Sequence, residues 1–172
     1  MDTYIYDGEK YYYKNGKWLT STYTSAPLAI VSKLNQLLIK NEDLGGNNYD
    51  ELITIIDGAR MSDNYQLAAQ ALEMAIRIAS EDDIRKLLPR LTSNYRKLGR
   101  SQTAIDISKA YTDQYGKKVW SAALFTSIAA AYCDIDNYET ARKFANLARS
   151  ISGMESSPEL ISVYKRIKQS EQ

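Results

Sequence analysis

The sequence of 172 residues contains no histidine and only one cysteine, Cys133. The lack of histidine removes the most common general base, the Ser–His and Cys–His nucleophile pairs and the most common zinc ligand. A single thiol cannot form an intramolecular disulfide or a thiolate metal site, and it fits a reducing compartment. We therefore expect no catalytic residues, no metal and no cofactor.

The sequence also lacks a phosphate-binding glycine loop and any long apolar run. No stretch approaches the roughly 18 apolar residues that span a bilayer. The first ten residues, MDTYIYDGEK, have no apolar core of the kind found in signal peptides. We expect a cytoplasmic protein with no membrane partner. Because the net charge is only +1, it gives no reason to expect nucleic acid either.

The residues that are present indicate a folded chain of two parts. The hydrophobic fraction is 44% and the charged fraction 25%, both ordinary for globular domains. Before residue 25 the chain is rich in Tyr, Thr and Lys, whereas after it apolar residues recur every three or four positions. We predict a first domain over residues 1–24 and an all-α domain over residues 25–172.

The segment from residue 4 to residue 20 predicts a three-stranded β-meander. Asp7-Gly8 and Asn15-Gly16 are strong signals for two-residue hairpin turns. Such turns pair Tyr6 with Glu9 and Lys14 with Lys17, and the alternation of side chains then collects five aromatic residues on one face. These residues are Tyr4, Tyr6, Tyr11, Tyr13 and Trp18.

This aromatic face has three interpretations. A sheet of this size is marginally stable alone, so packing against the helices is the first. Binding of a proline-rich or other peptide is the second, because aromatic grooves recognise polyproline II segments. The third is stacking on a glycan or a nucleic acid.

An internal repeat organises the helical part. Ala68, Ala104 and Ala141 are 36 and 37 residues apart. At four fixed offsets from each alanine, apolar or aromatic residues recur in every copy, on one face of each helix of a pair. Sixteen residues before the three alanines stand Leu52, Leu88 and Phe125, and nine before stand Ala59, Tyr95 and Tyr132.

At these residues the chain resembles the tetratricopeptide repeat family, most clearly in LFTSIAAAYCDIDNYETARKFANLARSI, residues 124–151. The resemblance implies a right-handed superhelical stack of helical hairpins, with repeats at about 49–79, 82–115 and 119–151. A leading helix at 26–40 and a capping helix at 157–170 would cover the two ends. Thr92 and Ser108 depart from the apolar pattern. Pro89 indicates that its helix either starts near Leu87 or bends.

The resemblance also implies a role, that of a protein–protein interaction adaptor. In this family the first helices line a concave groove that binds peptides or helices of partner proteins. Carried over by position, the groove residues are Asp57, Arg60, Lys86, Ser93, Arg96, Lys97, Thr126 and Asp134. Arg96 and Lys97 are the most suggestive, because cations can hold a carboxylate of the partner.

Two other partners remain open. Residues 82–118 carry nine Lys and Arg against four Asp and Glu, so the second repeat is basic. Together with the Tyr/Trp face it could bind a nucleic acid or a glycan, although nucleic acid is the less expected ligand. A second copy of the chain is the other option, because incomplete solenoids often bury an exposed end against one another.

Overall fold

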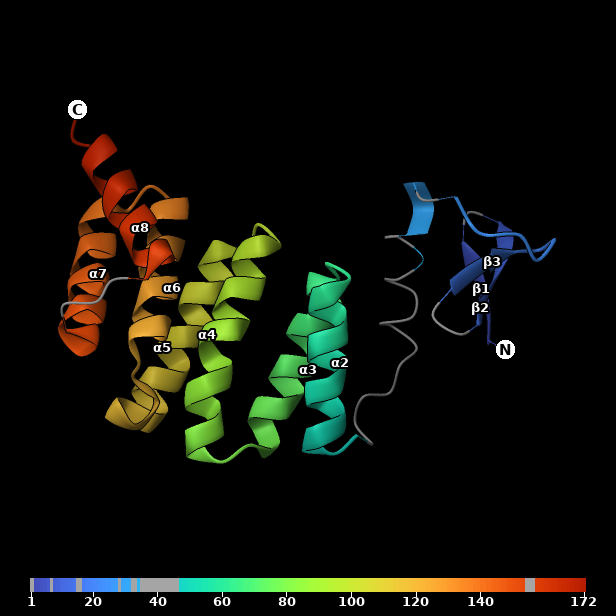
Figure 1. Cartoon of the computed structure of the whole chain (residues 1–172), viewed down its shortest axis with the longest axis horizontal. Coiled ribbons are helices and arrows are strands. Elements are labelled where there is room, and N and C mark those ends of the chain that lie inside the picture. The colour runs from blue at the N-terminus through green and yellow to red at the C-terminus, as the bar shows by residue number, and fades with distance from the viewer. Residues whose placement is uncertain are drawn as a thin grey trace. The chain divides into compact units, whose positions relative to one another are not determined.

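The computed structural model describes residues 2–6, 8–14, 17–27, 29–31, 34, 47–153 and 157–172. The chain forms two compact units, Met1–Gly46 and Asn47–Gln172 (Figure 1). The domain division before residue 25 and the boundaries of the repeats stay predictions.

The first unit contains an antiparallel sheet with strand order β1-β2-β3. Tyr6 pairs with Glu9 and Lys14 with Lys17, so both connections have two residues and the predicted register is confirmed. Gly8 adopts a φ of +79°, which suits the predicted turn because glycine accepts positive φ without strain. Asp7, Asn15 and Gly16 lie outside the described residues. The strands are β1 Asp2–Tyr6, β2 Glu9–Lys14 and β3 Lys17–Thr20.

The core of the first unit lies between the sheet and the segment that follows it. Trp18 and Tyr11 are 5% and 9% exposed, and they are buried together with Ala26 and Leu34. The backbone N–H of Ala26 also donates to the carbonyl of Trp18 over 2.9 Å. Of the helix predicted at 26–40, positions 26, 27, 29–31 and 34 are described; 29–31 and 34 are helical, whereas 26 and 27 are not.

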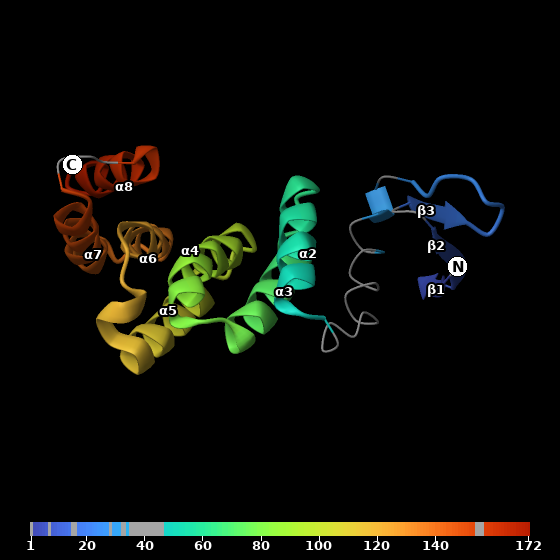
Figure 2. The ribbon, with the colours of Figure 1, turned by 60° about the horizontal axis from the view of Figure 1, so that its bottom comes forward.

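The second unit is a stack of helical hairpins, and within it the all-α prediction is confirmed. Consecutive helices pack as the pairs α2–α3, α4–α5 and α6–α7, and α8 packs against α6 and α7 (Figures 1 and 2). A short 3-10 helix, Gly116–Val119, follows α5. The α-helices are α2 Tyr49–Met61, α3 Tyr65–Ile78, α4 Glu81–Lys97, α5 Ser101–Tyr115, α6 Ala122–Asp134, α7 Tyr138–Ser152 and α8 Pro158–Gln169.

Small residues let the paired helices approach closely. Ala68, Ala104 and Ala141, which define the repeat, are all completely buried. The two polar departures from the repeat pattern also satisfy each other inside this core. The hydroxyls of Thr92 and Ser108 are 2.7 Å apart, between α4 and α5, so no polar group of this pair is buried without a partner.

The turn inside each hairpin has the same backbone geometry. Asp63, Gly99 and Asp136 occupy equivalent places and have φ values of +54°, +70° and +58°. In the first and third hairpins a tyrosine two residues later donates its hydroxyl to the aspartate, from Tyr65 over 2.8 Å and from Tyr138 over 2.9 Å. The second hairpin has no such pair, because glycine reaches the left-handed region without help.

Pro89 lies inside α4, well beyond its first turn. The helix begins at Glu81, where the hydroxyl of Ser80 accepts a hydrogen bond from the backbone N–H of Asp83. The alternative that α4 begins near Leu87 is therefore wrong.

Candidate partner-binding groove

Two adjoining hollows lie along the C-terminal ends of the first helices. The smaller, of about 500 Å³, lies between α2 and α4 and includes Asp57, Arg60 and Tyr65. The larger, of about 720 Å³, runs from the end of α4 over the α4–α5 turn to α6. Ser93 and Lys97 line both hollows, so the two hollows adjoin at these residues and are together called the depression.

Three exposed cations stand around this depression. Arg60, Lys97 and Arg100 are exposed, and within the described ranges no carboxylate forms an ion pair with any of them. Lys97 Nζ lies 5.6 Å from the centre of the Tyr65 ring, and the Arg100 guanidinium lies 5.0 Å from that of Tyr95. Aromatic faces hold these cations in place without neutralising their charge.

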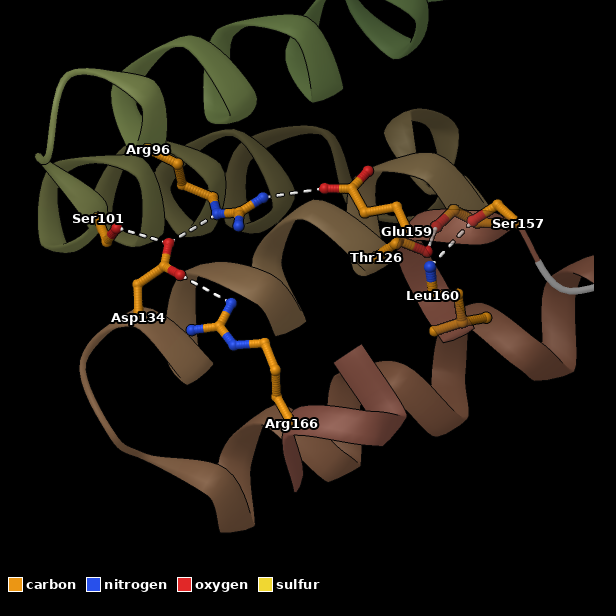
Figure 3. Close-up of polar contacts among 9 residues, drawn as sticks. Arg96, Ser101, Thr126, Asp134, Ser157, Glu159, Leu160 and Arg166 are labelled. Carbon is orange, nitrogen blue, oxygen red and sulfur yellow. Dashed lines mark hydrogen bonds and ion pairs between the residues drawn. The ribbon is translucent and has the colours of Figure 1, made fainter. Parts of the chain in front are cut away.

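Arg96, in contrast, is already occupied by two carboxylates. Its Nε donates to Asp134 Oδ2 over 2.8 Å, and its Nη1 donates to Glu159 Oε1 over 2.9 Å (Figure 3). Only 18% of its side chain is exposed. Arg96 therefore braces α4 against α6 and α8, and its charge is compensated within the protein.

Asp134 is the centre of this polar cluster. It accepts hydrogen bonds from Arg96 and from the Ser101 hydroxyl, the latter over 2.9 Å, and Arg166 Nη1 lies 2.9 Å from its other oxygen (Figure 3). Burial by itself would raise the pKa of Asp134, but the hydrogen bonds from Arg96, Ser101 and Arg166 outweigh it and hold the pKa below its usual value.

A third hollow, of about 600 Å³, lies between the N-terminal half of α4 and the start of α6. Pro89 and Ala123 contribute its apolar surface, and Lys86 and Arg90 stand beside them. Lys86 Nζ lies 3.5 Å from Asp83. The guanidinium of Arg90 forms an ion pair with Asp57, which connects α4 with α2.

Thr126 does not line an open surface. Its residue is 3% exposed, and its hydroxyl donates to the carbonyl of Ala122 over 2.8 Å, within its own helix. Of the eight predicted groove residues, seven line the hollows and Thr126 is covered. Of these seven, Arg96 and Asp134 line the larger hollow and pair with each other. The other five are Asp57, Arg60, Lys86, Ser93 and Lys97.

The aromatic face of the first unit is partly closed. Tyr11 and Trp18 are buried, and Tyr13 is half-buried with its ring 5.0 Å from that of Trp18. Tyr4 and Tyr6 lie on β1, and their side chains are outside the described part of the structure. Packing therefore accounts for Tyr11 and Trp18.

The described residues offer little chemistry beyond binding. No group of three or more Cys, Asp and Glu side chains comes together there in an arrangement that could hold a metal ion. Cys133 is buried, and burial raises the pKa of its thiol, which makes it a poor nucleophile. No helix among these residues combines the length and the apolar character needed to cross a membrane.

Three stacked helical hairpins with a hollowed row of first helices define a helical-repeat scaffold. The fold of this scaffold is similar to that of the TPR domain of Sgt2 from Aspergillus fumigatus. The TM-score is 0.61 at 17% sequence identity, and the match covers 72% of this chain and 78% of that one. The right-handed superhelical fold predicted from the repeat is thereby confirmed. No protein family and no curated protein sequence matches the chain.

Several residues of the site were missed in the sequence. Arg100, Ser101 and Glu159 line the larger hollow, and Arg90 and Arg166 hold Asp57 and Asp134. One signal was available. The first and third hairpins share the string Asp-Asn-Tyr at residues 63–65 and 136–138, whereas the second has Gly-Arg-Ser at 99–101. This difference marks the second turn as the unusual one.

Proposed function

We propose that this chain is a non-catalytic protein–protein interaction adaptor that binds a peptide or helical segment of a partner in the groove of its second unit. The observation that carries the proposal is the depression formed by the two hollows, which adjoin at Ser93 and Lys97. The fold of the second unit and the position of the depression along the first helices fit the binding of a helix or an extended peptide.

The charges around the depression favour an acidic segment. The acidic side chains at the site already pair with arginines: Asp57 with Arg90, and both Asp134 and Glu159 with Arg96. Arg60, Lys97 and Arg100 retain uncompensated positive charge, which draws carboxylates of a partner and steers its approach. Lys97 is the central residue because it lines both hollows.

A capture experiment tests this proposal. The full chain and its Arg60→Glu/Lys97→Glu variant are used to capture proteins from native lysate, followed by mass spectrometry. The matched control is Lys109→Glu/Lys168→Glu, which makes the same charge change at exposed positions outside the hollows. The proposal expects one partner that is retained by the control and lost with Arg60→Glu/Lys97→Glu.

Two results would count against it. A partner that remains bound to Arg60→Glu/Lys97→Glu would place recognition outside the depression. The absence of any partner would contradict the adaptor function, and a chain that then sediments as a dimer would make a second copy the ligand.

A cytoplasmic location belongs to the proposal and is supported by the single, buried thiol of Cys133.

Recognition of a nucleic acid or a glycan by the aromatic face is not advanced as a second function. Tyr11 and Trp18 are buried beneath residues of the same unit, and a ring must be accessible to stack on a base or a sugar.

A further inference from the structure

Equivalent groove positions become progressively closed from the first hairpin to the third. The repeat spacing relates Ile53, Asp57 and Arg60 on α2 to Pro89, Ser93 and Arg96 on α4, and to Thr126, Ala130 and Cys133 on α6. On α2 two of the three are exposed, on α4 all three are half-buried, and on α6 all three are buried, with exposures of 3%, 1% and 1%.

Helix α8 is the element that covers this face of α6. It packs against α6 and α7 and presents Leu160, Val163 and Ile167, which are exposed by only 1%, 1% and 3%. Their spacing of three and four residues places them on one face of the helix. Figure 3 shows the start of α8 beside Thr126, with Glu159 and Arg166 reaching towards α4 and α6.

Two ion pairs fix the position of α8 on this face. Glu159 accepts from Arg96 over 2.9 Å, and Arg166 lies 2.9 Å from Asp134. These residues are nearly two helical turns apart on α8. The acid therefore meets the C-terminal end of α4, and the base meets the C-terminal end of α6. This pattern fixes both the direction and the register of the bound helix.

The covered face also differs in chemistry from its counterparts. On α6 the positions are Thr126, Ala130 and Cys133, all small and uncharged, whereas α2 and α4 carry Asp57, Arg60 and Arg96 there. Small side chains let a second helix approach closely, and an amphipathic helix in an apolar groove is an established mode of recognition. The outer face of α8 is polar or exposed, with Ile161 exposed by 58%.

We propose that the groove face of α6 is a binding site for an amphipathic helix, that α8 fills it as an intramolecular ligand, and that a partner helix of the same pattern replaces α8. The pattern has aliphatic residues at i, i+3 and i+7, an acid just before the first and a base just before the last. The inference rests on the proposed function for the existence of a partner, but the site itself is independent of Arg60 and Lys97.

Replacement is feasible because α8 also has a face that the rest of the unit leaves exposed, at Ile161, Ser162 and Lys165. Elements with few buried neighbours open locally at lower free energy than the core of a fold. Helix α8 contributes three buried aliphatic side chains, and an incoming helix of the same pattern restores the same contacts. The partner helix therefore regains most of the contact free energy that is lost when α8 leaves. It must be present at a concentration that competes with the effective concentration of the tethered α8.

Cys133 provides a direct measurement, because it is the single cysteine of the chain and lies on the covered face. We would measure its rate of reaction with a disulfide reagent in the full chain and in the Glu159→Lys/Arg166→Glu variant. Reversing both charges removes the two ion pairs and should raise the rate about tenfold or more by favouring the open state. The matched control is Glu139→Lys/Lys143→Glu, which reverses an exposed pair on α7 and should leave the rate unchanged.

The second step adds a synthetic peptide with the sequence of residues 157–172, SPELISVYKRIKQSEQ. The peptide should restore protection of Cys133 in Glu159→Lys/Arg166→Glu, with slowing that saturates as the peptide concentration rises. A peptide with serine in place of Leu160, Val163 and Ile167 should have no effect. Circular dichroism verifies that each protein remains helical. Val163→Asp serves as a second variant, because a charge at this buried position is unfavourable and should release α8 from its site.

Three outcomes would overturn the proposal. The first is a thiol that stays as slow in both released variants as in the wild type, because α8 would then not be the cover. The second is an exposed thiol that the peptide does not protect. The third is loss of helicity in both variants, because α8 would then be an indispensable part of the fold. The assay does not involve Arg60 or Lys97, so its result is separate from that of the capture experiment.

Discussion

Arg96 on α4 donates through Nε to Oδ2 of Asp134 on α6 over 2.8 Å, and this bond joins the second hairpin to the third. The same carboxylate also receives Ser101 from α5 and Arg166 from α8. One acidic side chain thus connects four helices.

Asp134→Asn should destabilise the protein most clearly at neutral pH. The amide cannot accept two charge-assisted hydrogen bonds as the carboxylate does, so we expect a loss of about 1–3 kcal/mol in the free energy of unfolding. Because the pKa of Asp134 is lowered in the folded state from 3.8, its contribution is complete above about pH 4 and declines as the pH falls further.

Urea unfolding at pH 7 and at pH 3 tests this dependence. The difference between wild type and Asp134→Asn should be smaller at pH 3. Asp113→Asn, at an exposed residue of α5, is the control and should show no such change. An equal difference at both pH values would mean that charge is not what the site requires.

The buried hydroxyl pair of Thr92 and Ser108 should show coupling in a double-mutant cycle. Each hydroxyl has one proton, so one hydroxyl donates to the other, and the second donates to its own main-chain acceptor, Leu88 for Thr92 or Ala104 for Ser108. Each single change, Thr92→Val or Ser108→Ala, should therefore cost about 1 kcal/mol. The double variant should cost clearly less than the sum, since each single change already removes the bond between the two hydroxyls and that bond can be lost only once. Strict additivity in chemical denaturation would contradict a direct interaction.

Helix α7 should depend on the side chain of Asn137. Its amide oxygen accepts a hydrogen bond from the backbone N–H of Thr140 over 3.2 Å, which satisfies one of the free donors at the helix start. Asn137→Ala should lower the free energy of unfolding by about 1 kcal/mol, whereas Asn137→Ser should retain most of the stability because serine also caps. Thermal unfolding of the three proteins decides the matter, and equal losses in both variants would refute a capping role.

Tyr95 should make the protein sensitive to alkaline pH. Its hydroxyl donates to Glu73, and burial followed by this contact raises its pKa to about 12. The neutral phenol is thus favoured in the folded state relative to the unfolded one, where the value is 10.0. The associated stability is complete below about pH 10 and is lost as the pH rises towards 12.

Tyr95→Phe removes this titration and keeps the ring. The free energy of unfolding of the variant should fall less steeply between pH 10 and pH 12 than that of the wild type. Tyr23→Phe, at a residue exposed by 60%, should leave the slope unchanged. Parallel curves for wild type and Tyr95→Phe would contradict the assignment.

The fold was largely predictable because its determinants are local or periodic. Two-residue turn signals determine the register of the sheet, and the recurring alanines at 68, 104 and 141 mark the places where paired helices touch. Both features depend on spacing along the chain, which the sequence displays directly.

The site was less predictable because its contacts join distant positions. Arg96 meets Asp134 and Glu159, 38 and 63 residues further along the chain. Position in the repeat predicted Arg96 as a groove residue, but it could not show which carboxylates share that space. For the same reason Thr126 was expected in the groove, since nothing in its own repeat indicates that α8 covers it.

The turn in the second hairpin has a consequence for how such a scaffold can diversify. All three turns follow the same backbone path, yet the second uses Gly99 and Ser101 where the others use an aspartate and a tyrosine. The small side chains leave the space that forms the larger hollow, and the freed serine reaches Asp134. Substituting two residues of a hairpin turn can therefore open a cavity at one step of a repeat stack while the turn keeps its left-handed residue.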